Sequence, residues 1–173
     1  LIHGIYPDCL TLEKTNVDCW SFPTLDIRIV SSQVAQHDGA GNVVGTVVVA
    51  ETELYDKRRE KCYDGIPVVQ YTHVSSSISQ VVTSSILLGQ LHRFRELIMR
   101  RNNYVVESAL LLWRMINRGY KRELLFAKLK RHLRMYPDTF GDATFKPLFT
   151  DIMSVFHSPA VVAHIVGGAP LQL

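Results

Sequence analysis

Lysine and arginine residues are concentrated in one part of the chain, between residues 91 and 134. This segment holds 12 Lys or Arg residues and three Asp or Glu residues, a net charge of +9, in a chain whose total net charge is +3. Residues 1–90 carry a net charge of −4 and residues 135–173 a net charge of −2. Segregated positive charge is typical of a surface that binds a polyanion. The chemistry is the pairing of ammonium and guanidinium groups with phosphate oxygens.

The spacing of these cations supports the same interpretation. Like charges four residues apart destabilise a helix by about 0.2–0.5 kcal/mol per pair. Three such pairs occur here: Arg114 with Arg118, Arg118 with Arg122, and Lys130 with Arg134. A bound phosphate backbone would relieve this repulsion, whereas a solvated helix face normally mixes both signs. We therefore expect a nucleic acid as the partner, with a membrane surface or an acidic protein as alternatives.

The other reactive residue types show no catalytic pattern. The seven histidines are scattered, the serines at 75–85 lie outside any nucleophile-elbow sequence, and no glycine-rich phosphate loop is present. Asp26, Glu51, Glu53 and Asp56 have no spacing that indicates convergence on two metal ions. We expect no catalytic residue, no metal site and no cofactor.

The three cysteines, Cys9, Cys19 and Cys62, are odd in number and lack CxxC spacing. This pattern predicts reduced thiols in an intracellular protein. A zinc site completed by His73 stays open as an alternative, although the spacing matches no common ligand pattern. No apolar run reaches the roughly 18 residues that a membrane-spanning helix needs, so we expect no membrane partner.

The first part of the chain, which precedes the cations, has the pattern of β-structure. Alternation in Phe22–Gln33, the turn sequence of His37–Asn42 and the β-branched run of Val43–Lys57 together predict a long β-hairpin. Short strands are also predicted at Leu10–Lys14 and Ile66–Tyr71.

The part that carries the cations has helical periodicity. Leu87, Leu91, Phe94 and Ile98 recur at steps of three and four residues, which predicts a helix over residues 79–101 with this stripe buried. Residues 100–103 are interpreted as a break.

Three further helices are predicted over residues 104–119, 121–136 and 145–156, with Gly119 and Pro137 as stop signals. Phe94 and Trp113 are expected in the core. Stacking of Tyr104 and Tyr120 on bases stays open.

The order of these elements predicts an α+β fold, in which a β-hairpin or small antiparallel sheet is followed by a bundle of three to four helices. We divide the chain into a β-rich part at residues 1–73, a helical part at 74–158 and a tail at 159–173.

Six short motifs occur in an order that resembles the distal part of a retroelement reverse transcriptase, of the non-LTR and Penelope-like type. The resemblance covers residues 6–134. The matching residues are Thr11 and Glu13; Leu25, Asp26 and Ile27; Thr52, Leu54, Tyr55 and Lys57; His73 and Ser75; Gln90, Leu91, Arg93 and Phe94; and Arg118, Gly119 and Tyr120.

The resemblance implies the end of a polymerase palm, with its primer-contacting hairpin, followed by a thumb that contacts the backbone of a duplex. It implies no active site, because the family's catalytic strand with paired aspartates lies upstream of this segment. The sequence departs from the family pattern at Thr24, Thr72 and Gly89, where the family has Phe, Pro and Ser or Thr.

Two settings fit this resemblance. The first is an RNA-binding subunit of a ribonucleoprotein, such as an organellar (mitochondrial) ribosome, alongside other protein subunits. The second is the C-terminal fragment of an active RNA-directed DNA polymerase, whose palm and fingers lie elsewhere, with a nuclear or organellar location. A basic membrane-surface or protein-scaffold module is a third alternative from a different class.

The residues expected to contact nucleic acid combine the resemblance with the charge pattern. An alternative for Arg93 is a structural ion pair with Glu96 or Glu107. The candidates are Gln90, Arg93, Arg100, Arg101, Arg114, Arg118, Lys121, Arg122, Lys128, Arg131 and Arg134.

Overall fold

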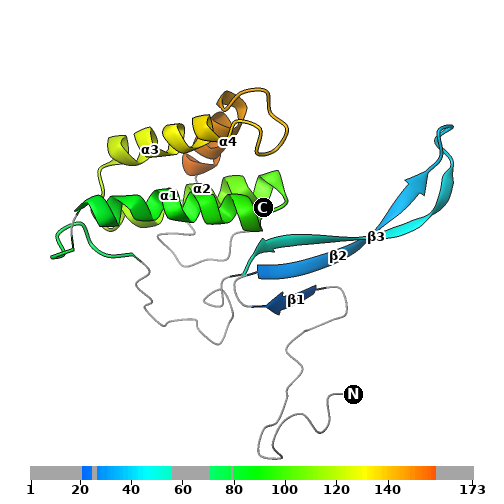
Figure 1. Ribbon diagram of the computed structural model, residues 1–173, viewed down its shortest axis with the longest axis horizontal. Helices are drawn as coiled ribbons and strands as arrows, with labels where there is room; N and C mark the ends of the chain where they lie inside the picture. Colours follow the sequence, from blue (N-terminus) through cyan, green and yellow to red (C-terminus); the bar gives the residue numbers. More distant parts are fainter. Residues whose placement is uncertain (1–20, 25–26, 56–70, 79, 159–173) are drawn as a thin grey trace, which may run out of the picture.

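The protein has a small antiparallel sheet followed by a layer of helices, and the α+β prediction is confirmed (Figure 1). The computed structural model describes residues 21–24, 27–55, 71–78 and 80–158. The strands follow one another in the sheet in the order β1-β2-β3. The elements are β1 Ser21–Thr24, β2 Ile27–His37, β3 Val43–Leu54, α1 Gln80–Leu97, α2 Arg101–Ile116, α3 Arg122–Met135 and α4 Lys146–Phe156.

Several predicted features fall beyond these residues. The strand predicted at Leu10–Lys14, most of the strand at 66–71 and the tail at 159–173 lie outside the described ranges. The matches at Thr11, Glu13, Leu25, Asp26 and Lys57 also lie outside them, as do the three cysteines.

The run predicted as one strand, Phe22–Gln33, forms two. Thr24 pairs with Ile27 in antiparallel register, so the chain reverses direction between β1 and β2. The prediction of a continuous strand was therefore wrong. Pro23 lies in β1, at the edge of the sheet, where its missing N–H interrupts no central ladder.

The long hairpin was predicted correctly and is formed by β2 and β3. Pairing runs from Ile27 opposite Leu54 to His37 opposite Val43, with a bulge at Gln36/His37. The Asp38 carboxylate closes the turn by accepting hydrogen bonds from the backbone N–H of Ala40 at 2.9 Å and of Asn42 at 2.8 Å. These bonds, chiefly those from Asn42, lower the pKa of Asp38. This is the turn chemistry expected of an Asx residue.

The base of the hairpin is joined to the helices by polar contacts at the junction between α1 and α2. The Met99 N–H donates to the Thr52 carbonyl at 3.1 Å, and the Asn103 side-chain amide donates to Glu53 at 3.0 Å. Arg100 forms an ion pair with Glu51. Beyond this base, residues 33–50 are all exposed, and the hairpin projects away from the helices (Figure 1). We call residues 33–50 the arm.

The helices enclose the core. The stripe of Leu87, Leu91, Phe94 and Ile98 is buried, as predicted, and packs with apolar residues of the other three helices. α2 is buried on most of its surface and packs mainly against α4, while α1 packs mainly against α3. No helix in the described residues is long and apolar enough to cross a membrane.

The aromatic residues of α2 belong to this core. Trp113 is half-buried, stacks on Phe156 with ring centroids 4.8 Å apart, and donates its indole N–H to the Phe156 carbonyl at 2.8 Å. Tyr104 and Tyr120 are 1% and 4% exposed, so neither ring is available to stack on a base. Burial raises the pKa of Tyr104 to about 12.

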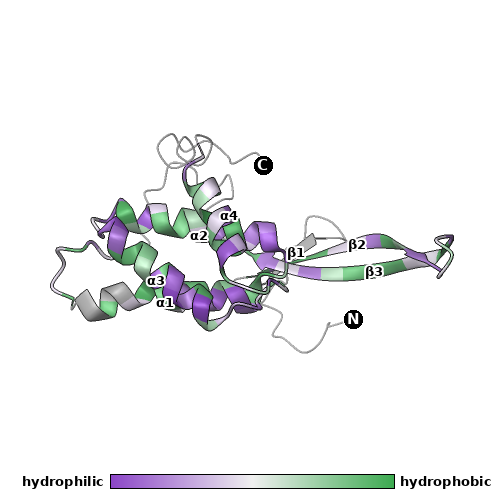
Figure 2. Cartoon of the chain, turned by 90° about the horizontal axis from the view of Figure 1, so that it is seen from above, coloured by the Kyte–Doolittle hydropathy of each residue, from purple (hydrophilic) through white to green (hydrophobic). Residues whose placement is uncertain are grey.

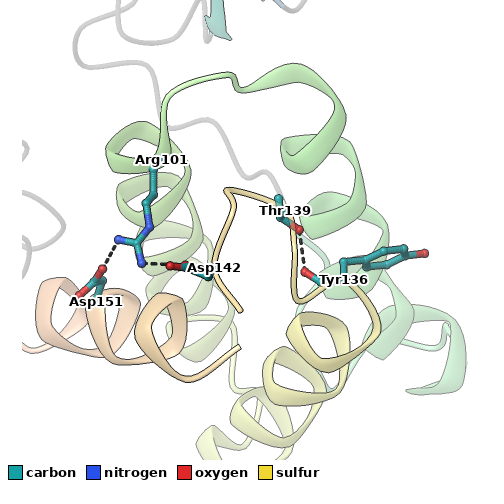
Figure 3. A network of polar contacts seen from close by, with 5 residues as sticks. All are labelled: Arg101, Tyr136, Thr139, Asp142 and Asp151. Atoms are coloured by element: carbon teal, nitrogen blue, oxygen red, sulfur yellow. Dashed lines mark hydrogen bonds and ion pairs between the residues drawn. The ribbon is translucent and has the colours of Figure 1, made fainter. Parts of the chain in front are cut away.

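α2 begins three residues earlier than predicted, at Arg101 rather than Tyr104. A cation in a first turn is unfavourable for the helix dipole. Here Arg101 pairs with Asp142 and Asp151, which are 41 and 50 residues away, so that negative charge lies at this helix start (Figure 3). The predicted break between the two helices is present, but it lies at residues 98–100 rather than 100–103, because α1 ends at Leu97 and α2 begins at Arg101.

Candidate nucleic-acid interface

α3 separates its apolar and charged residues onto two sides. Leu125, Leu129 and Leu133 are buried against the other helices, together with His132. Glu123 in the first turn and Arg134 in the last turn both complement the helix dipole. Glu123 is also the only acidic residue of this helix. The buried leucines therefore hold a basic surface outward.

Three of the α3 cations lie over phenylalanine rings of α4 and its N-cap. The distances to the ring centroids are 5.7 Å from Arg122 to Phe156, 4.9 Å from Lys130 to Phe149 and 5.1 Å from Arg134 to Phe145. In each case the charged head lies over the ring face, and the residue as a whole stays exposed. These contacts offset part of the repulsion between Lys130 and Arg134, so the like-charge spacing does not by itself require a phosphate.

Five cations at or near this helix remain exposed. We call Lys121, Arg122, Lys130, Arg131 and Arg134 the α3 face. Among the described residues, none of the five forms an ion pair with a carboxylate. Four were predicted as contacts and Lys130 was missed. The sequence feature that points to Lys130 is its four-residue spacing from Arg134, which we interpreted above only as a source of charge repulsion.

Arg100 and Arg101 are engaged by carboxylates. The guanidinium of Arg101 lies between Asp151 and Asp142, 3.0 Å from the latter, and these hydrogen bonds, first that to Asp151, raise its pKa (Figure 3). Arg100 is held by Glu51 at the base of the hairpin. A phosphate would have to compete with these carboxylates, so we leave both residues out of the interface.

Arg118 holds the segment that leads into α1. Its Nε donates to the Tyr71 carbonyl at 2.9 Å, and its own carbonyl accepts from the Val74 N–H at 3.0 Å. The Tyr120 hydroxyl donates to the Thr72 carbonyl at 3.2 Å. The motif at residues 118–120 therefore holds residues 71–74 in place by hydrogen bonds, and we call these contacts the clamp. This structural role explains the position of the Arg118 side chain without a bound ligand.

Gly119, within the same motif, has a φ of 89°, and a Cβ there would lie 2.7 Å from a methyl carbon of Val74. Both the left-handed backbone and the close approach require glycine. His73 and Ser75 form a local turn, in which the Ser75 N–H donates to the imidazole Nδ1 at 3.2 Å.

The remaining candidates are half-buried. Gln90 and Arg93 lie on α1, Arg114 on α2 and Lys128 on α3. Arg93, Arg114 and Lys128 all interact with other groups of the protein. The ion pair proposed for Glu96 is made by Arg95, at 2.7 Å, rather than by Arg93.

A second cluster of titratable groups joins α1 to the end of α3. His132 is 2% exposed, its ring centroid lies 5.1 Å from that of Tyr136, and Arg95 lies 4.2 Å over the Tyr136 ring. Burial first, and then the charges of His92 and Arg95, lower the pKa of His132 to about 4. The imidazole is therefore neutral at pH 7 in the folded protein, and its Nε2 has no hydrogen-bond partner among the described residues. We interpret it as a core residue.

No group of three or more His, Cys, Asp or Glu side chains in the described ranges could hold a metal ion. The zinc alternative rests on cysteines that lie outside these ranges.

Comparison with known proteins leaves the family open. No family model matches the chain, and neither a curated protein nor a solved structure matches it. The resemblance to reverse transcriptases therefore stays a prediction.

Proposed function

We propose that this protein binds structured RNA or an RNA–DNA duplex through the α3 face. The observation that carries the proposal is the set of five exposed cations, none of which is in an ion pair with a carboxylate in the described part of the chain. Several exposed cations spread along one helix suit a phosphate backbone better than a compact anion.

The recognition is of backbone and shape rather than of sequence. The exposed cations of α3 have no Asn or Gln beside them on that helix, and Arg122, Lys130 and Arg134 lie over the neighbouring aromatic rings. Tyr104 and Tyr120 are buried. A-form duplexes are read largely through their phosphates and 2′-hydroxyls, which this surface suits.

The setting that we favour is a non-catalytic RNA-binding subunit of a ribonucleoprotein. Support comes from the departures from the family pattern at Thr24, Thr72 and Gly89, which suit a protein without catalytic demands. A catalytic fragment would need paired aspartates from another segment, so primer extension by the 173-residue chain alone is not expected.

Two charge-matched variants test the proposal. K130Q/R131Q/R134Q removes three positive charges from the α3 face, while R28Q/R95Q/R100Q removes three from residues held in ion pairs. Binding to a duplex RNA of about 20 base pairs is measured by fluorescence anisotropy at low salt. The first variant should weaken binding by at least about tenfold, and the second by no more than about threefold.

The controls make the outcome decisive. Equal weakening by both variants would mean that net charge alone governs binding, and the proposed interface would be wrong. Absence of binding by the unmodified protein at low salt would contradict the function itself.

A further inference from the structure

The arm is apolar and almost without charge. It contains six valines, at positions 34, 43, 44, 47, 48 and 49, and a single charged residue, Asp38. Val48 is 59% exposed and Val34 is 49% exposed. Figure 2 shows hydrophobic residues along β3 in this region. A two-stranded ribbon is marginally stable in water by itself, and exposed strand edges normally carry lysine or proline against association. The arm has neither.

Along the arm both outer edges lack a partner strand among the described residues, because β1 pairs with β2 only from Ile27 to Val30. The β3 edge is the one that carries the consecutive valines Val47, Val48 and Val49. β3 is the last strand of the sheet, and no described residue pairs with its outer side between Thr46 and Ala50. The Thr52 carbonyl points outward, because it accepts from the Met99 N–H at the base. Backbone direction alternates along a strand, so the amide groups of Thr46, Val48 and Ala50 also point outward.

One face of the arm has a valine cluster beside this edge. Val34 lies opposite Val47 in the β2–β3 register, and Ser32 lies opposite Val49. Side chains of paired residues share a face, so Val34, Val47 and Val49 lie together. The cluster ends at this edge and stays partly exposed to water, since Val47 is 45% and Val49 37% exposed.

We propose that a second copy of this chain occupies the edge, with the two β3 strands paired antiparallel about a two-fold axis at Val48. The outward amides of Thr46 then bond to those of Ala50 in the second copy, and those of Val48 to their own equivalents. Val47 lies opposite Val49 of the second copy, so the two valine clusters merge on one face of a four-stranded sheet. An isologous contact of this kind is the commonest way in which identical chains pair.

The charge distribution favours a second copy over a nucleic acid. The arm has no Lys or Arg with which to neutralise phosphate. Its uncharged edge is a place where two copies of a basic protein can meet without repulsion. The arm also projects away from the helices, so pairing through its edge keeps the two α3 faces apart (Figure 1). This inference does not depend on the proposed binding of RNA.

Sedimentation velocity over a concentration series tests the pairing. Val48→Lys places like charges opposite each other on the axis, while Val82→Lys makes the same change at a valine of α1 that is 60% exposed. The unmodified protein and Val82→Lys should dimerise alike, and Val48→Lys should weaken dimerisation by at least about tenfold.

A cysteine pair gives an independent readout in a background where Cys9, Cys19 and Cys62 are replaced by serine. Residues on the axis have Cα atoms about 5.5 Å apart in a hydrogen-bonded antiparallel pair, which suits a disulfide. Val48→Cys should therefore oxidise to a covalent dimer. Ala35→Cys on β2 should not, because three strand spacings of about 4.8 Å separate it from its equivalent.

Two results would overturn the proposal. One is a monomer at every concentration up to about 100 µM, which would mean that another segment or partner covers the edge. The other is dimerisation of Val48→Lys with unchanged strength, together with no disulfide from Val48→Cys.

Discussion

The α3 face and the arm both expose long surfaces, and their physical properties are opposite. α3 is charged on its exposed side because its other side contributes Leu125, Leu129 and Leu133 to the core. The arm has no core beneath it, and both of its faces are exposed and nearly uncharged. One surface attracts a polyanion in water, and the other gains stability when it is removed from water. The net charge of +3 hides both properties, because it averages over them.

The largest contrast expected between the two regions is in stability. Leu129 is fully buried, so Leu129→Ala should lower the free energy of unfolding by about 2–5 kcal/mol. Val44 is 60% exposed on the arm, and Val44→Ala should change it by less than about 0.5 kcal/mol. Urea unfolding followed by circular dichroism measures both. Similar losses from both substitutions would mean that the arm is packed as tightly as the helices.

Acid should destabilise the helices through His132. Its pKa is about 4 in the folded protein and 6.5 ordinarily, so the unfolded state binds the extra proton between these values. The stability from the neutral imidazole is complete above pH 6.5 and falls as the pH drops toward 4, by about 3 kcal/mol in all.

Urea unfolding of the unmodified protein and of His132→Leu, each at pH 7.5 and 4.5, tests this linkage. The carboxylates contribute equally to the pH dependence of stability in both proteins, so the difference between the two reports on His132. His132→Leu should lose less stability on acidification than the unmodified protein, by about 2–3 kcal/mol. His92→Gln, at an exposed position, serves as the control and should retain most of the pH dependence. An identical pH dependence in His132→Leu would show that His132 is not buried as a neutral group.

Two glycines should respond in opposite directions to the same change. Gly119→Ala should cost about 1–3 kcal/mol, because φ is 89° and the new methyl would meet Val74. Gly89 lies within α1 with open space around it, so Gly89→Ala should stabilise by about 0.5–1 kcal/mol. Thermal melts compare the two variants. A stabilised Gly119→Ala protein would contradict the clamp between residues 118–120 and 71–74.

The smallest effect on stability is expected on the α3 face itself. Arg131 is exposed, so Arg131→Gln should change the free energy of unfolding by less than about 0.5 kcal/mol. Arg118→Gln should cost more, because it removes the bond to the Tyr71 carbonyl. Chemical denaturation of the two variants separates a surface cation from a structural one. Equal losses of the free energy of unfolding in the two variants would mean that Arg131 stabilises the fold, as Arg118 does, rather than serving as a surface contact.

The sequence predicted the helical part well because its signals are local. The stripe from Leu87 to Ile98 repeats with helical periodicity, and all four of its residues are buried. The strand predicted over Phe22–Gln33 divides between Thr24 and Ile27, where the alternating sequence pattern contains no signal of a reversal. The start of α2 was missed for another reason, since Arg101 depends on Asp142 and Asp151 far along the chain.

The same distinction limits the candidate site. The charge pattern located the basic region, but it could not show which cations have partners within the fold. Arg100 and Arg118 are held by Glu51 and Tyr71, which are 49 and 47 residues away. Lys130 is exposed like Arg131 and Arg134, and its four-residue step to Arg134 was the signal for including it. The sequence does not show that Lys130 lies over Phe149 of α4.

The salt dependence of RNA binding tests the central claim, that the α3 face binds a phosphate backbone, most directly. The slope of log Kd against log salt concentration counts the phosphates that are neutralised. We expect K130Q/R131Q/R134Q to reduce this slope by about three, while R28Q/R95Q/R100Q leaves it within about one of the unmodified protein. A slope that K130Q/R131Q/R134Q leaves unchanged would contradict the claim, because the α3 face would then contact no phosphate.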